Sequence, residues 1–589
     1  MSRRGQLFLK AGSVLLFASA PLAGSVQPAS ASSAAPADSE EPLVRAMRDE
    51  LARSMQQLKL PDAAAPYYIA FRVDEQTNLT ASASFGALTS KQTSRGRSFR
   101  ADVRVGDYAL DNSNTGGRYD FNTTGFERLP IEDDYDAIRH DIWYGSDQTY
   151  KQAAAEYAKK IASRKTQNQS SDEVGDFSRE KPSRIVGRRA TEAPDSEQVV
   201  GLVKQLSALA KNFPEIQGSE VKLAVTSERR VVLTSEGTFT DGTHETVTLN
   251  ATLRTQADDG MPLTRMVSFS ATSLEALPSR EVLVEAIKRA GGELSELRHA
   301  READDYTGPV LFEGPAAAQL VREMLGPNFS GAPAPKSDAM GSMARAMGGK
   351  ETEWAGKVGQ RVVATGLGVM DDPTVDHIGS LNLLGQYAAD DEGMPAERVS
   401  LVEKGILKRF LMSRAPRKGF EHSNGHARSS FFASAKASIS NLVVTADKGL
   451  NAADLRKKLL AEATSAKLPY AIVVRELDDA VSSGDYSAIL RRAQGANVSP
   501  PTVVLQVTAD GKEQPWRGAT FASFPLQAFE EIVAAGNEPA VTSWAVGTAG
   551  SVVSPALLFK RVEIKKPTGP QRKLPLLPHP FFAEKGSNR

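Results

Sequence analysis

The 589-residue chain contains no cysteine, and this absence removes several kinds of structure and chemistry at once. It excludes disulfide bonds, thiolate metal ligands and the lipid-modified cysteine that anchors bacterial lipoproteins. Excess charge of either sign is absent as well, because Lys+Arg and Asp+Glu each number 71. No long basic run is present, so we predict no nucleic-acid partner, since binding to phosphate backbones draws on clustered positive charge.

The N-terminus has the pattern of a secretory signal peptide. Ser2-Arg3-Arg4 and Lys10 precede an apolar stretch over 11–22, and Ala29-Ser30-Ala31 offers a small-residue cleavage site. The arginine pair also suggests the twin-arginine export route. Because the apolar stretch is too short for a membrane span, we expect residues 1–31 to be a signal peptide. The protein is therefore predicted to be periplasmic or secreted, without a membrane anchor.

An N-terminal domain is expected over 41–300, after a disordered lead-in over 32–40 that is rich in Ala, Ser and Pro. An apolar stripe that begins at Pro42 predicts an amphipathic helix ending before Pro61. Strand patterns follow at 67–73, 80–85 and 98–105. Basic residues from Arg95 to Arg104 alternate with apolar ones, which indicates the solvent face of a strand.

The rest of this domain alternates between helical and strand patterns. From Asp133 the pattern predicts helix with a break at Gly145-Ser146, then a polar arm at about 164–190. Asp195 is placed to cap the next helix. Residues 221–272 have strand patterns with turn signals at Asp241-Gly242 and Asp259-Gly260, and a helix over 280–290 is expected to close the domain.

A second domain, expected over 305–589, begins with a strand, a turn and a buried helix. Val310–Phe312 predicts the strand and Gly314-Pro315 the turn, after which apolar residues recur at helical spacing up to Leu325. Pro315 suits the first helical turn, where a backbone N–H has no partner to lose.

Many short strands and one helix, over 452–465, are predicted beyond Glu353. The strands are expected at 358–363, 396–402, 441–444, 471–474, 503–507 and 552–558. Strands and helices without regular alternation predict an α+β fold. In this fold an N-terminal domain of helices and a sheet precedes a mainly antiparallel, barrel-like C-terminal domain.

The segment around the buried helix resembles the TldD/PmbA family of metallopeptidases, whose zinc helix carries His-Glu-x-x-x-His. Aligned on Glu323 and Gly326, the two histidine positions hold Arg322 and Pro327. Further segments resemble family motifs in the same order along the chain: Asp371-Asp-Pro373, Asp390-Asp-Glu-Gly393, Arg398–Leu407, Asn424–Arg428, Ser440–Leu442, Trp516–Gly518 and Pro555–Leu558.

The resemblance implies a dimer around an enclosed chamber. In active members the two histidines and a cysteine near the C-terminus hold the metal, and the motif glutamate acts as general base. Gly547–Gly550 resembles the surroundings of that cysteine and places Ala549 at its position. A guanidinium and a proline have no lone pair for a cation, so we predict no cofactor and no activity of the chain alone. Glu323 is then an ordinary helix carboxylate, paired with Arg322 or another cation.

His422 and His426, beside Glu421, form the only local arrangement that could replace the metal site. Ser423-Asn424-Gly425 between them predicts a turn, which removes the helical premise of that spacing. His426 and Arg428 are instead candidates for contact with a bound peptide, and the simplest alternative for His426 is a hydrogen bond to loop backbone. The acids at 371–372, 376 and 390–392 are interpreted as turn residues and not as calcium ligands.

Three functional hypotheses follow. The first is an exported, metal-free member that binds extended or unfolded peptide, as a homodimer or with a TldD-like paralogue. The second is an active metallopeptidase with zinc in a non-standard site made by His422, His426 and Glu421 or Glu323. The third is a self-associating envelope protein with a structural role.

Overall fold

The computed structural model describes residues 41–114, 126–167, 174–187, 195–333, 351–429, 434–479, 498–545 and 547–567. The predicted signal peptide and lead-in lie outside these residues, as does most of 332–350. Described residues from Pro42 onward belong to one compact unit. No helix in the described segments is long and apolar enough to cross a membrane.

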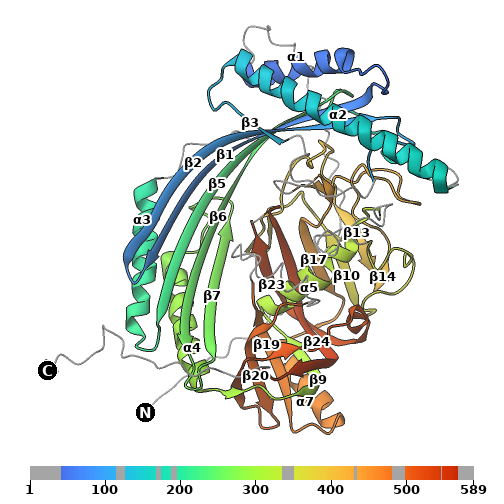
Figure 1. Cartoon of the computed structure of the whole chain (residues 1–589). Coiled ribbons are helices and arrows are strands. Elements are labelled where there is room, and N and C mark those ends of the chain that lie inside the picture. Colours follow the sequence, from blue (N-terminus) through green and yellow to red (C-terminus); the bar gives the residue numbers. More distant parts are fainter. Residues whose placement is uncertain are drawn as a thin grey trace, which may run out of the picture. The chain divides into compact units, whose positions relative to one another are not determined.

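Long antiparallel hairpins build the first sheet (Figure 1). Its strands run in the order β3-β2-β1-β5-β6-β4, and β7 pairs with β6. The strands are β1 (Pro66–Ser84), β2 (Ala87–Val105), β3 (Phe126–Leu129), β4 (Arg184–Val186), β5 (Gly218–Thr234), β6 (Phe239–Gln256) and β7 (Pro262–Ala271).

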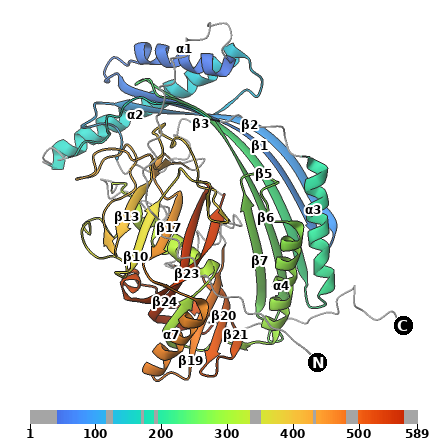
Figure 2. The same ribbon diagram turned by 180° about the vertical axis from the view of Figure 1, so that it is seen from behind.

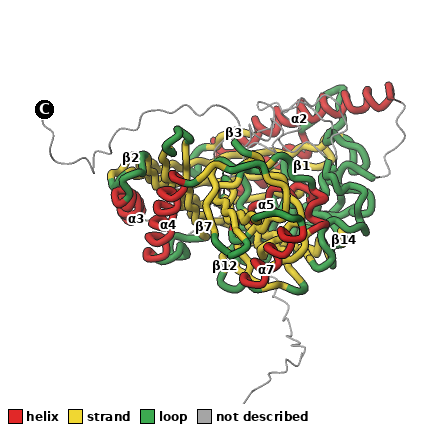
Figure 3. Tube along the Cα trace, turned by 90° about the horizontal axis from the view of Figure 1, so that it is seen from below, coloured by secondary structure: helices red, strands yellow, loops and turns green. Residues whose placement is uncertain are grey.

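Helices cover the apolar face of this sheet because side chains on a strand alternate between faces. Phe71 and Val73 of β1 pack with α1 (Pro42–Gln57) and α2 (Tyr135–Gln167). Leu79 and Ala81, further along the same strand, pack with α3 (Ser196–Ala208) and α4 (Arg280–His299). Figure 3 shows α3 and α4 side by side along the sheet.

Several predictions for this half are wrong in their boundaries. Residues 80–85 are no separate strand, because β1 continues to Ser84. The expected break at Gly145-Ser146 lies inside α2, which continues through it, and the buried Ser146 hydroxyl is satisfied by donating to the carbonyl of Ile142. Helix α4 extends past 290 to His299, since Gly291 packs against the ring of Phe213.

The turn and charge predictions are also partly wrong. Asp259-Gly260 joins β6 and β7 as expected, but Asp241-Gly242 lies within β6. There Asp241 pairs with Arg229 instead of forming a turn. The basic residues of β2 do not share a solvent face, because Arg97 is buried and ion-paired with Glu75.

A second, mixed sheet of thirteen strands forms the other half. Its main path runs β14-β13-β10-β17-β24-β9-β19-β20-β21-β8. Outside this path, β22 and β23 each pair with β24, and β18 pairs with β23. These strands are β8 (Arg301–Glu302), β9 (Tyr306–Phe312), β10 (Leu367–Asp371), β13 (Val399–Glu403), β14 (Ile406–Leu407), β17 (Asn441–Ala446), β18 (Gly449–Leu450), β19 (Tyr470–Leu477), β20 (Pro501–Thr508), β21 (Glu513–Arg517), β22 (Thr520–Phe521), β23 (Ile532–Trp544) and β24 (Gly550–Lys565).

The α+β class is confirmed, and most predicted strands of the second half exist. The expected strand at 358–363 is wrong, since only Arg361 forms an isolated bridge there after a turn at Gly359. Barrel closure is not confirmed, because the path of described strands stays open between β14 and β8. Two minor hairpins, β11 (His377–Ile378) with β12 (Leu381–Asn382) and β15 (Ala427–Arg428) with β16 (Lys436–Ala437), lie outside this sheet.

The second sheet is buried on both faces, which explains its continuous apolar strands. Ile472 and Val474 of β19 pack in the core that contains α5 (Pro315–Met324). The alternate residues Ala471 and Val473 pack with α7 (Ala452–Ser465). Figure 2, seen from behind, shows α7 beside β19. The predicted helix at 452–465 is therefore confirmed to the residue.

A buried carboxylate, Asp391, links strands of the first sheet to a loop of the second half. Its side chain is 1% exposed and receives Arg230 of β5, with Arg72 of β1 at 3.5 Å and Arg428 at 3.7 Å. Ser429 donates its backbone N–H at 2.6 Å. Burial alone would raise the pKa of Asp391, but the three guanidinium charges outweigh it and hold that pKa well below its usual range.

We therefore expect Asp391→Asn to lower the free energy of unfolding by about 3 kcal/mol at pH 7, because the guanidinium groups lose a buried counter-charge and Asp74 still pairs with only two of them. A depressed folded-state pKa contributes stability above the unfolded pKa of about 4, and this contribution is lost as the pH falls further. The variant should thus lose less stability than the wild type below about pH 4.

Urea unfolding followed by circular dichroism measures both effects. Glu197→Gln is the matched control, because Glu197 pairs with Lys91 at 3.0 Å with 79% of its side chain exposed, and exposed pairs contribute under about 1 kcal/mol. Equal stability of Asp391→Asn and wild type would show that the carboxylate does not hold the arginines.

Candidate functional site

Helix α5 carries the degenerate motif and is buried along its length. Gly314 precedes it with a positive φ of 57°, and Pro315 occupies the first turn. Gln319 fixes the helix against β19, since its Oε1 accepts the Leu477 N–H at 2.8 Å. Residues from Ala316 to Met324 are all buried, so every polar group on this helix needs a partner inside the protein.

Arg322, at the first histidine position of the motif, is buried and paired with two carboxylates. Its Nη2 donates to Asp479 Oδ1 at 2.8 Å, and Glu323 Oε1 lies 3.7 Å away. The guanidinium also lies 5.8 Å from the ring centre of Trp544. Burial disfavours the charge, but Asp479 outweighs it and raises the pKa of Arg322. The group is therefore a permanent cation.

Glu323 is fully engaged within the protein. Ser499 donates its N–H and its hydroxyl to the two carboxylate oxygens, each at 2.7 Å. The expected proximity to Arg322 is found, but the serine, which lies beyond it in the sequence by more than 170 residues, supplies the short hydrogen bonds.

The other two motif positions offer no donor atoms. Pro327 is exposed at the start of a 3-10 turn, Gly326–Phe329. Ala549 is half-buried beside Gly550, which packs so closely on Trp544 that a Cβ there would lie 2.3 Å from the ring. Trp544 thus connects Arg322 to the loop of Ala549. A guanidinium, a pyrrolidine ring and a methyl group have no lone pair to offer, so these side chains do not fit the divalent cation that the family resemblance implies.

His422 and His426 do not converge on a common point. His422 is 74% exposed and lies 3.4 Å from Glu180. His426 is fully buried, with Nδ1 2.8 Å from the Asn424 carbonyl oxygen and Nε2 3.2 Å from Asp371. The contact with the Asn424 carbonyl agrees with the alternative predicted for His426, a loop histidine hydrogen-bonded to backbone. Among the described residues, no three His, Asp or Glu side chains lie together in a way that could hold a metal ion.

The remaining candidate residues serve contacts within the chain. Glu421 accepts the N–H of Gly419 at 3.0 Å. Arg428 lies over the ring of Tyr387, 4.3 Å from its centre, and joins the Asp391 network. A role for His426 or Arg428 in contacting peptide stays a prediction.

Asp372 and Asp390 form turns, as their chemistry predicts, whereas Asp371 ends β10 and Asp391 lies in the ion-pair network, so the turn prediction is wrong for these two. Asp372 Oδ1 accepts the N–H of Thr374 at 3.0 Å, and Asp390 Oδ1 accepts that of Met394 at 2.9 Å. Asp371 accepts the N–H of Ser440 at 2.9 Å and so fixes the start of β17.

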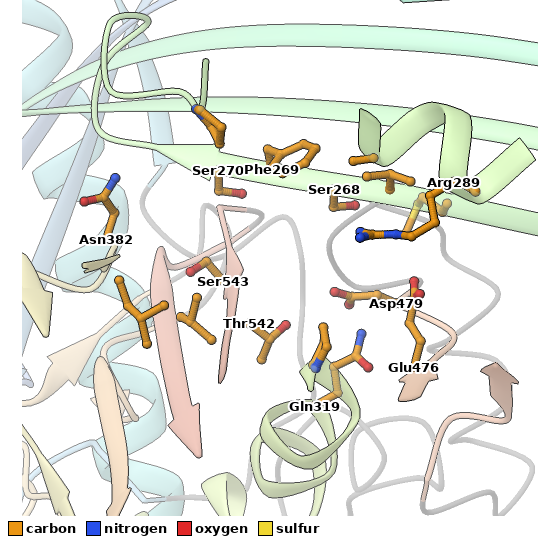
Figure 4. Close-up of a pocket in the computed structure, with 18 of the residues that line it drawn as sticks. Ser268, Phe269, Ser270, Arg289, Gln319, Asn382, Glu476, Asp479, Thr542 and Ser543 are labelled. Atoms are coloured by element: carbon orange, nitrogen blue, oxygen red, sulfur yellow. The ribbon is translucent and has the colours of Figure 1, made fainter. Parts of the chain in front are cut away.

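A cleft of about 430 Å³ beside α5 was not predicted (Figure 4). Six consecutive residues of β7, Arg265–Ser270, and three of β23, Val541–Ser543, line it together with Gln319 and Asp479. Because side chains of a strand alternate between faces, consecutive lining residues mean that strand edges border the cleft. Among the described strands, β7 pairs with β6 alone, so its other edge is free.

Most charges in the cleft are neutralised by neighbours. Arg265 donates to Glu476 and to Glu293, at 2.7 Å in each case. Asp479 is paired with Arg322. Burial raises the pKa of Glu476 even though Arg265 opposes this shift. Polar edges and paired charges suit a cleft for a polymer backbone better than one for a small apolar ligand.

Replacing Asp479 tests the ion pair on α5. Asp479→Asn should lower the free energy of unfolding by about 3 kcal/mol, because Arg322 would stay buried with only the more distant carboxylate of Glu323, at 3.7 Å, beside it. Arg322→Met combined with Asp479→Leu should cost clearly less than the sum of the single changes, with a coupling of about 1–3 kcal/mol. Denaturant unfolding of the wild type, Arg322→Met, Asp479→Leu and the double variant gives this coupling. Glu462→Gln, which breaks the partly exposed pair with Lys458, is the control, and strictly additive costs at 322 and 479 would contradict the account.

Comparison with known proteins agrees with this geometry. Residues 305–566 match the family model of the PmbA/TldA metallopeptidase C-terminal domain. A metalloprotease from Methanothermobacter thermautotrophicus is 42% identical over 76 residues, and one from Archaeoglobus fulgidus is 36% identical over 74 residues. Each alignment covers 13% of this chain, and they span only 15% and 16% of those relatives.

Solved structures share the fold over most of the chain. TldE from Thermococcus kodakarensis superposes with a TM-score of 0.56 at 16% identity, covering 88% of this chain and all of the other. A proposed modulator of DNA gyrase from Thermotoga maritima gives a TM-score of 0.54 at 14% identity over 84% of this chain and 96% of its own. At these identities the likeness shows the fold. Together with the order of the motifs, the match of residues 305–566 to the PmbA/TldA C-terminal domain supports the TldD/PmbA family for this chain.

Proposed function

We propose that this protein is an exported, metal-free member of the TldD/PmbA family that binds extended peptide and acts as a non-catalytic subunit. The observation that carries the proposal is the ion pair between Asp479 and Arg322 of α5, at the position where the family resemblance places a metal ligand. A metal ion would supply an activated water and a Lewis acid. Glu323, bonded to Ser499, has no such water to deprotonate.

Peptide binding is supported by the cleft between β7 and β23. The two strands approach each other there, and each presents a border of consecutive residues. A free strand edge offers unpaired N–H and C=O groups, which an extended chain can satisfy by adding as a further strand. Hydrogen bonds to the backbone do not depend on sequence, so unfolded segments of many sequences would fit.

The proposal also includes export of the protein and its association with a second subunit. Residues 1–31 have the signal-peptide pattern, which supports a periplasmic or secreted location. Without donor atoms at Arg322, Pro327 and Ala549, hydrolysis would need a TldD-like paralogue with an intact His-Glu-x-x-x-His motif as partner. A homodimer would instead bind peptide without cleaving it.

Metal analysis tests the first part. The purified protein should hold well below one transition-metal ion per chain, and added zinc should not raise its melting temperature, since only a ligand of the folded state does so. It should not cleave unfolded peptide alone, while a relative with the intact motif serves as the positive control. Near-stoichiometric zinc together with chelator-sensitive cleavage would refute the proposal.

A bulky substitution tests the second part. Ser270→Trp should fill the cleft and weaken binding of a fluorescein-labelled peptide of Ala, Ser, Thr and Val by at least about tenfold, because the added strand would lose its place. Fluorescence anisotropy measures the affinity. Ser94→Trp, on the exposed outer edge of β2, is the matched control; if it weakens binding and Ser270→Trp does not, the peptide binds to the edge of β2 instead.

A further inference from the structure

A single cation distinguishes the cleft from a neutral strand-binding groove. Arg289 of α4 lines the cleft, and Figure 4 shows its guanidinium pointing into it, above Asp479 and Gln319. The other arginine that lines the cleft, Arg265, is bound to two glutamates. Among the described residues, no hydrogen bond or ion pair joins Arg289 to the protein, and its side chain is exposed.

The helix offers Arg289 two partners that it does not use. Glu285 and Glu293 lie four residues before and after it, at the spacing where ion pairs form on a helix surface. Glu293 is instead engaged by Arg265, with contacts of 2.7 Å and 3.2 Å from the guanidinium nitrogens. Arg265 of β7 thus engages the carboxylate on α4 that could otherwise neutralise Arg289.

The acids on the facing side of the cleft are satisfied as well. Glu476 pairs with Arg265 at 2.7 Å, and Asp479 pairs with Arg322 at 2.8 Å. A guanidinium presents several donors in a planar fork that matches a carboxylate, so the uncompensated group in this cleft is a carboxylate receptor.

We infer that the cleft selects extended peptides that carry a carboxylate, either a C-terminal one or an Asp or Glu side chain, and that Arg289 binds it. This inference rests on the proposed peptide binding. The strand edges of β7 and β23 bind the backbone, and Arg289 sets which peptides bind tightly. Arg289 is a specificity-determining residue in this scheme and takes no part in bond cleavage.

Three labelled octapeptides of Ala, Ser, Thr and Val test the inference. The first is acetylated and amidated, so that it has no charge. The second has a free C-terminal carboxylate, and the third is acetylated and amidated with one internal glutamate. At low salt the second or third should bind about five- to tenfold more tightly than the first, and salt should reduce this preference. Whichever of the two binds more tightly identifies the source of the carboxylate.

Arg289→Gln and Lys288→Gln each remove one positive charge from adjacent positions of α4, so they serve as a matched pair. Arg289→Gln should abolish the preference for the peptides with a carboxylate, whereas Arg289→Lys should keep part of it. Lys288→Gln, at the adjacent exposed position outside the cleft, should keep all of it.

Each other outcome has a definite meaning. Equal binding of the three peptides to the wild type, or a preference that persists in Arg289→Gln, would overturn the inference while peptide binding stands. Absence of binding by any peptide would overturn the proposed function together with it.

Discussion

The candidate site depends on one buried charge, the guanidinium of Arg322. A cation inside a protein must be paired, because the loss of hydration costs several kcal/mol otherwise. Asp479 supplies the pair at 2.8 Å and the ring of Trp544 covers the group. Trp544 also packs on Gly550, so the same ring contacts both the guanidinium of α5 and the start of β24 beside Ala549. The position that resembles the first motif histidine is therefore part of an ion-pair site in this chain.

The cleft and the ion pair belong to one arrangement. Asp479 is both the partner of Arg322 and part of the cleft lining, so the pairing that neutralises Arg322 also neutralises a negative charge in the cleft. Arg265 acts in the same way on Glu476 and Glu293. Among the described residues, the lining then consists of two strand edges and the unpaired guanidinium of Arg289, which is the arrangement on which the proposed peptide binding rests.

Much of the fold could be predicted from local patterns. Helices α5 and α7 and the strand β24 follow from apolar spacing within a single segment, so the sequence was sufficient for them. Boundaries failed where a distant group decides the local structure. Gly291 continues α4 because Phe213 packs on it, and Asp241 stays in β6 because Arg229 binds it.

The candidate site was predictable only in what it lacks. Arg322 and Pro327 are visible at the motif positions, but Asp479 and Ser499 lie more than 150 residues away and have no motif of their own. The cleft was missed because it needs β7 and β23 together, and each strand alone looks like an ordinary strand. Nothing in the sequence separates Arg289 from its neighbour Lys288. Their difference arises only when α4 is placed beside β7.

The claim that a metal-free cleft between β7 and β23 binds peptide can be tested by hydrogen exchange of the backbone amides. Exchange is measured with and without an unfolded peptide, both before and after a chelator is added. The account predicts slower exchange at 265–270 and 541–543 when peptide is present, and the same protection after chelation. Protection that disappears on chelation, or that falls elsewhere and leaves both strands unchanged, would contradict a metal-free peptide cleft at this place.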